Sequence, residues 1–135
     1  MALAALDTNV LLRLVIPDLP DQQRRARALL TLPGARYLVS DYVVVELVFT
    51  LDRHYGLTRD QIADTVSALI ALDTFACHSE RLAAALAFWR THPKLSFEDC
   101  LMAGYAAARG AVPLWTFDHN LATQHPSARE VPADQ

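Results

Sequence analysis

Short apolar runs alternate along the chain with longer segments in which apolar residues recur at helical spacing. The apolar runs are typical of buried strands and lie at residues 2–6, 37–39, 74–77 and 112–116. Helical spacing predicts helices at residues 10–16, 21–32, 40–55, 58–72, 79–91 and 97–109. Strands that alternate with helices predict an α/β fold, a three-layer arrangement with a central parallel sheet and helices on both faces.

Capping residues mark where several of these helices begin and end. Ser40 and Thr58 are typical N-caps, and Gly56 and Gly110 are typical of positions just past a helix end. The run of three valines at 43–45 suits a strand as well as a helix. Because the segment is long and begins with a cap, we expect a helix there.

Two further features bear on burial. The segment 97–109 is apolar almost all round, which predicts a buried helix, and Trp89 and Trp115 are expected in the core. The tail from residue 126 to 135 is polar and contains proline, so it is either a short edge strand or frayed.

The length and composition fit one domain over residues 1–135, with its core at about 2–122, and we expect this domain in the cytoplasm. The chain has 135 residues, of which 53% are hydrophobic, enough for a core without disulfides. Cys77 and Cys100 lie in separate apolar segments and are expected as buried thiols in a reducing compartment. The apolar start lacks a basic region and reaches Asp7 after six residues, so neither a signal peptide nor a membrane span is predicted.

The formal net charge is −3, which makes the chain a poor general binder of nucleic acid. If the chain acts on RNA, bound cations or a local basic patch must attract the phosphates. Arginines 13, 24, 25 and 27 gather on the first two predicted helices and offer such a patch, although a solvated helix face is an equally ordinary interpretation.

Four of the fifteen acidic residues occupy apolar surroundings. Asp7 and Asp118 follow predicted strands, Glu46 lies within an apolar helix, and Asp99 is near the start of another. Parallel strands bring their carboxyl ends to one edge of a sheet, where ligands bind. Taken alone, each acid also suits a helix cap, a turn or an exposed helix stripe.

The surroundings of the four acids favour a metal site. Burial of a neutral polar group without a partner costs about 2–7 kcal/mol, and burial of an unpaired carboxylate costs more. Basic residues that could pair with the four acids are scarce in these segments. Carboxylate oxygens are ligands that Mg²⁺ and Mn²⁺ prefer. The pattern therefore predicts carboxylates that converge on a divalent cation, which suits phosphodiester cleavage.

The same acids stand in four motifs that resemble those of PIN-domain ribonucleases, specifically VapC-type toxins of bacterial toxin–antitoxin pairs. The resemblance runs from the first strand to about residue 122. Its motifs are Leu-Asp-Thr-Asn-Val-Leu-Leu around Asp7, Ser40 with Glu46, Phe-Glu-Asp-Cys-Leu-Met-Ala around Asp99, and Thr-Phe-Asp ending at Asp118. One departure is Ser96, where the family often carries an additional acid; Ser96 suits a helix cap instead.

The resemblance implies a Rossmann-like sandwich and an endoribonuclease that hydrolyses RNA phosphodiester bonds with Mg²⁺ or Mn²⁺. It implies a homodimer that a VapB-type antitoxin neutralises. Asp7, Glu46, Asp99 and Asp118 are then the catalytic and metal-binding acids, with Asp7 and Asp99 as direct ligands and Asp118 serving a second metal. Asn9 would orient Asp7, and the hydroxyl of Thr116 would accompany Asp118.

Two other functions remain open on the sequence. A phosphohydrolase of the haloacid-dehalogenase kind would use Asp7 as nucleophile, but it needs a second acid where this chain has Asn9. A PIN-fold RNA- or protein-binding module without nuclease activity is the second alternative. His119, beside Asp118, suits either a phosphate donor or an ordinary exposed histidine.

Overall fold

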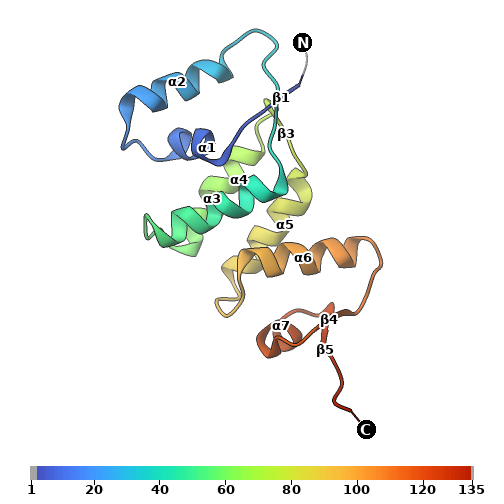
Figure 1. Ribbon diagram of the computed structural model, residues 1–135. Helices are drawn as coiled ribbons and strands as arrows, with labels where there is room; N and C mark the ends of the chain where they lie inside the picture. The colour runs from blue at the N-terminus through green and yellow to red at the C-terminus, as the bar shows by residue number, and fades with distance from the viewer. Residues whose placement is uncertain (1–2, 135) are drawn as a thin grey trace. The chain divides into compact units, whose positions relative to one another are not determined.

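The computed structural model describes residues 3–134 and has the predicted α/β fold with parallel strands. Residue 2 of the first predicted strand and residue 135 of the tail lie outside the described residues. The chain divides into two compact units, residues 1–79 and 80–135 (Figure 1). Each unit is described by itself.

The first unit alternates strands and helices. Its elements are β1 (Ala4–Ala5), α1 (Thr8–Val15), α2 (Pro20–Leu30), β2 (Tyr37–Leu38), α3 (Asp41–Arg53), α4 (Arg59–Ile70) and β3 (Phe75–Ala76). The strands form a parallel sheet in the order β1-β2-β3, with Ala4 opposite Tyr37 and Tyr37 opposite Phe75. Because the strands are parallel, Asp7 after β1 and Ser40 after β2 leave the sheet at the same edge.

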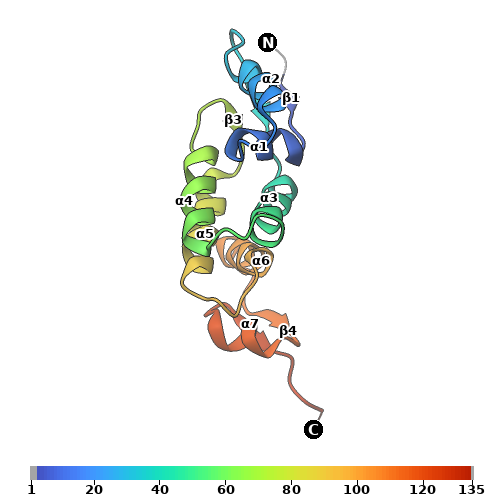
Figure 2. The same ribbon diagram turned by 90° about the vertical axis from the view of Figure 1, so that its left-hand side faces the viewer.

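Packed helices make the core of this unit. Helix α1 packs against α2 and α3, and α3 packs against α4, as the turned view also shows (Figure 2). The side chains at the centre of these contacts are almost completely buried: Leu11 on α1, Val44, Leu47 and Leu51 on α3, and Ile62 and Val66 on α4. The valine run in segment 40–55 suited a strand as well as a helix. The segment is helical, as predicted, and its valines and leucines bury one face of the helix.

Local capping signals set the helix ends as predicted. The hydroxyl of Ser40 accepts a hydrogen bond from the Val43 N–H at 3.2 Å, and α3 starts at the next residue. Thr58 and Gln61 form a capping box at the start of α4. Gly56 has a φ of 63°, a left-handed conformation that glycine adopts without a steric penalty, and it closes the turn after α3.

The second unit contains three helices and two strands within the described residues. They are α5 (Ser79–Arg90), α6 (Phe97–Ala108), β4 (Leu114–Thr116), α7 (His119–Gln124) and β5 (Ala128–Glu130). Strands β4 and β5 pair in parallel, so the tail provides the short edge strand that was one of its two predicted conformations. Helix α7 packs against both strands, and sequence patterning did not predict this helix.

Two burial predictions for this unit are wrong. Helix α6 buries one face, with Phe97 and Cys100 inside, while Met102 and Tyr105 are 46% and 44% exposed. Trp115 is 54% exposed, because neighbours along a strand point to opposite faces and α7 packs against only part of this two-stranded sheet. Trp89, by contrast, is buried as predicted and meets Phe97 edge to face at 6.1 Å between ring centroids.

The two cysteines are free thiols, as predicted. Cys100 is buried, and Cys77 is half-buried at the end of β3. Burial raises the pKa of the Cys77 thiol, and the nearby Asp41 carboxylate raises it further. The Cys77 thiol is therefore expected in the neutral, unreactive form at neutral pH.

Candidate functional site

Asp7 stands at the junction of β1 and α1, where it caps the helix. Its backbone is extended (φ −88°, ψ 167°), and its Oδ1 accepts a hydrogen bond from the backbone N–H of Asn9 at 2.7 Å. The side chain is exposed, and Oδ2 accepts no hydrogen bond from the described residues. The cap therefore fixes the orientation of the carboxylate and leaves one oxygen open.

Thr8 connects this position with Glu46. Thr8 is the first residue of α1, and its Oγ1 donates a hydrogen bond to Oε1 of Glu46 on α3 at 2.8 Å. The contact is partly buried and joins residues that are 38 positions apart. The first two predicted acids thus lie on either side of one threonine, at the edge of the sheet where β1 and β2 end.

Asp99 occupies the first turn of α6, and Ser96 caps that helix. The Ser96 hydroxyl accepts from the Asp99 N–H at 3.1 Å, which confirms Ser96 as the cap. The Asp99 carboxylate is half-buried and forms no hydrogen bond or ion pair with the described part of its unit. Its neighbour Glu98 is exposed.

Asp118 sits in the turn from β4 to α7. Its backbone N–H donates to the Thr116 hydroxyl at 2.9 Å, and its Oδ1 accepts from the Leu121 N–H at 3.0 Å. Thr116 therefore holds the turn that carries the last acid, which agrees with its expected association with Asp118. As at Asp7, the side chain is exposed and one oxygen takes the capping hydrogen bond.

Two of the four acids do not lie in the apolar, low-dielectric surroundings that the sequence predicted. Asp7 and Asp118 are exposed, because each caps a helix from a turn at a strand end; only Glu46 and Asp99 are half-buried. Within its own unit none of the four pairs with a described basic side chain, in line with the scarcity of basic partners in the sequence.

Over residues 3–134, no group of three or more His, Cys, Asp or Glu side chains is close enough to hold a metal ion. Asp7 and Glu46 belong to the first unit, and Asp99 and Asp118 to the second. Their oxygens are nevertheless the hard donors that Mg²⁺ and Mn²⁺ take, and the open Oδ2 of Asp7 is available for such an ion.

Asn9 and Thr8 contact the two acids of the first unit. Asn9 contacts Asp7 through its backbone N–H, while its side chain lines a cavity between α1 and α2. Thr8 was not predicted as a functional residue. The only signal for it was a hydroxyl next to the first acid, and its partner on α3 cannot be read from local sequence.

The arginines on α1 and α2 are divided between neutralised and exposed positions. Arg13 is nearly buried and pairs with Asp18 through Nη1 and Oδ1 at 2.5 Å. Arg24 pairs with Asp21 one turn away, and both side chains are exposed. His119 is exposed too, as its ordinary interpretation predicts, with Nδ1 3.6 Å from an oxygen of Glu130.

The comparison with family models matches residues 4–124 to the PIN domain. Since the match covers most of the chain, the chain belongs to the PIN domain family, and members of this family are commonly nucleases that use divalent metals. This membership removes the ground for the dehalogenase-like alternative. The comparison with curated proteins found no match. No helix among the described residues is long and apolar enough to cross a membrane.

Proposed function

We propose that this protein is an endoribonuclease that hydrolyses RNA phosphodiester bonds with Mg²⁺ or Mn²⁺, using Asp7, Glu46, Asp99 and Asp118. The observation that carries the proposal is the hydrogen bond from Thr8 to Glu46, because it brings the acid of the second motif beside that of the first. Membership of the PIN domain family supports nuclease chemistry.

The four carboxylates have distinct parts in this proposal. Asp7 offers the oxygen that its cap leaves open, and Glu46 is held in one orientation by Thr8. Asp99 contributes a half-buried carboxylate without a counter-charge, and Asp118 one that its cap and the Thr116 turn hold in place. When bound, a divalent cation would neutralise charge on the oxygens of the phosphodiester group whose P–O bond is cleaved.

RNA cleavage in the presence and absence of metal tests the proposal. Single-stranded and structured RNAs are incubated with the full chain in Mg²⁺, Mn²⁺ or EDTA. We expect cleavage in both metals and none in EDTA, and a loss of about a hundredfold or more in Asp7→Asn, since even groups that only support a metal ligand are worth 10- to 100-fold.

Asp52→Asn is the matched control, because it removes one exposed carboxylate of α3 outside the four motifs. Its cleavage rate should equal that of the wild type. Cleavage that persists in EDTA, or that Asp7→Asn leaves unchanged, would contradict the proposal.

We further propose that the enzyme acts in the cytoplasm as the toxin of a VapBC-type pair, as a homodimer neutralised by a VapB-type antitoxin. The four motifs that resemble VapC-type toxins support this role. Induced expression should arrest growth, Asp7→Asn should not, and co-expression of an antitoxin encoded next to the gene should restore growth. Light scattering should give twice the mass of the chain. Unimpaired growth in the presence of active enzyme would favour RNA processing instead.

The second candidate function is the one that the sequence left open, a PIN-fold module that binds RNA or protein without cutting it. Such a module would bind RNA equally well in EDTA and Mn²⁺ and would leave it intact. The cleavage assay therefore separates the two functions directly.

A further inference from the structure

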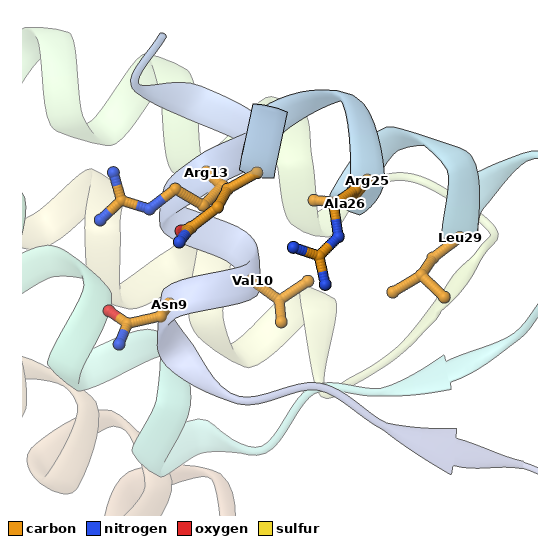
Figure 3. A pocket seen from close by; sticks show the side chains of 7 residues that line it. Asn9, Val10, Arg13, Arg25, Ala26 and Leu29 are labelled. Atoms are coloured by element: carbon orange, nitrogen blue, oxygen red, sulfur yellow. The ribbon is translucent and has the colours of Figure 1, made fainter. Parts of the chain in front are cut away.

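A cavity of about 410 Å³ lies between α1 and α2 in the first unit. Its lining comes from both helices: Asn9, Val10 and Arg13 from α1, and Gln22, Arg25, Ala26 and Leu29 from α2. Figure 3 shows Arg25 reaching from α2 toward Val10, with Leu29 further along the same helix. The volume lies within the range of sites that hold small organic ligands.

The two arginines of the cavity are held very differently. Arg13 is only 14% exposed and is fixed by its 2.5 Å ion pair with Asp18. Arg25 is 74% exposed, and its Nη1 lies 3.7 Å from the nearest oxygen of Asp21, which is at the long end of ion-pair distances. The Arg25 guanidinium is thus an exposed cation that lines the cavity and has only a long ion pair, which suits it to a phosphate group.

The remaining lining combines apolar and amide groups. Val10, Ala26 and Leu29 provide apolar surface for the face of a planar ring. Asn9 and Gln22 carry side-chain amides, which donate and accept hydrogen bonds and so match the edge of a nucleobase. An apolar surface, two amides and an exposed arginine together fit one nucleotide.

The cavity also adjoins the proposed catalytic acids. Asn9 lines the cavity, and its backbone N–H donates to Oδ1 of Asp7 at 2.7 Å. A ligand in the cavity would therefore contact a residue that lies two positions from Asp7, the first proposed metal-binding acid. This position beside a proposed catalytic acid suits the binding of a substrate group.

We propose that this cavity is a subsite for one nucleotide of single-stranded RNA, adjacent to the phosphodiester bond that is cut. The inference rests on the proposed function and deepens it. The base lies against Val10, Ala26 and Leu29, its edge meets the amides of Asn9 and Gln22, and Arg25 pairs with its phosphate. Sequence preference at this position follows from the amides, and affinity for any sequence follows from Arg25.

Binding of fluorescent single-stranded RNA in EDTA, measured by anisotropy on the full chain, tests the subsite without cleavage. Arg25→Ala should weaken binding of all sequences by about tenfold, and Gln22→Ala should weaken it selectively for one base at one position. Both side chains are exposed, so both variants should keep the fold, which circular dichroism checks.

Arg27→Ala is the matched control. It removes the same charge from the same helix, but Arg27 does not line the cavity. We expect less than a twofold change in RNA affinity. Equal losses in Arg25→Ala and Arg27→Ala would reduce the effect to general charge and overturn the subsite. RNA binding unchanged in both cavity variants, with loss of a co-purifying protein partner instead, would assign the cavity to that partner.

Free nucleotides and the cleavage assay complete the design. Nucleoside monophosphates should compete with RNA for the wild type, and inorganic phosphate alone should compete more weakly, because it lacks the base. If the wild type does not cleave but Arg25 and Gln22 still govern RNA binding, the nuclease proposal fails and the subsite stands. If cleavage is intact and neither variant changes affinity or KM, the subsite fails alone.

Discussion

Replacement of Thr8 by valine removes a single hydroxyl and tests the contact on which the candidate site depends. Valine keeps the shape of threonine, so the packing of α1 against α3 should persist while Glu46 Oε1 loses its donor at 2.8 Å. Hydrogen bonds to charged groups contribute about 1.5–3 kcal/mol. Because this pair is only partly buried, water replaces some of that loss. We expect the free energy of unfolding to fall by about 1–2 kcal/mol.

Thr8→Ser is the matched control, since it keeps the hydroxyl and loses the methyl group. Urea unfolding at pH 7 in EDTA should place Thr8→Ser close to the wild type and Thr8→Val below both. A double-mutant cycle with Glu46→Gln then isolates the coupling between the two side chains, which should account for most of the Thr8→Val loss. Independent, additive effects would show that the hydroxyl does not act through Glu46.

The same variants separate positioning from stability. Titration calorimetry with Mn²⁺ should show an affinity about 10- to 100-fold weaker in Thr8→Val, and near that of the wild type in Thr8→Ser. A merely structural threonine would lower stability without changing the affinity of the folded protein for the metal. Equal Mn²⁺ affinity in wild type and Thr8→Val would refute a positioning role for Thr8.

Two pH dependences follow from the structure. Burial raises the pKa of Asp18, but the hydrogen bond from Tyr55 and the charge of Arg13 outweigh this effect and hold the pKa below its ordinary 3.8. The loss of Tm in Asp18→Asn should therefore be full at pH 7 and should shrink as the pH falls below about 3.8. A loss of Tm that does not change with pH would contradict this. Burial lowers the pKa of His125 below its ordinary 6.5, and its Nδ1 accepts from the Ser127 N–H at 3.1 Å, which requires the unprotonated nitrogen. Since the unfolded chain takes up the proton first, urea unfolding should show wild-type stability falling relative to His125→Asn as the pH drops below about 6.5. Parallel pH profiles would rule this linkage out.

Helix ends were predictable because their signals are local. Ser40, Thr58 and Ser96 each cap the helix that follows through a contact to a residue three positions on. Gly110 has a φ of 69° after α6, as a residue just past a helix end should. Contacts of this range are encoded in a few adjacent residues, so pattern reading recovers them.

Burial was less predictable because it depends on which elements meet. The apolar content of α6 gives no indication that Met102 and Tyr105 face outward. The alternation along β4 places Trp115 on the face of the sheet opposite to that of Leu114 and Thr116. It does not indicate which of the two faces a helix covers. Helix α7 was missed for a related reason, since only one of its residues, Leu121, is buried and its six-residue span has little periodicity.

The acids themselves were identified from motifs, while the contact that joins two of them is a long-range event. Thr8 and Glu46 are 38 residues apart, and the approach of α1 to α3 that unites them depends on packing around Leu11 and Leu47. No local pattern carries that information. The sequence therefore singled out Asp7 and Glu46 as candidates, and the structure added the threonine that joins them.

Capping and metal binding looked like competing interpretations of Asp7 and Asp118 in the sequence, and the geometry makes them compatible. Each acid uses Oδ1 to accept a backbone N–H at the start of a helix, from Asn9 in one case and Leu121 in the other. That hydrogen bond restricts the side chain to one orientation, and the second oxygen accepts no hydrogen bond from the described residues. A carboxylate whose rotamer is already fixed loses less conformational entropy when it binds a cation. Under the proposed function, the cap therefore prepares each of these exposed aspartates to act as a metal ligand.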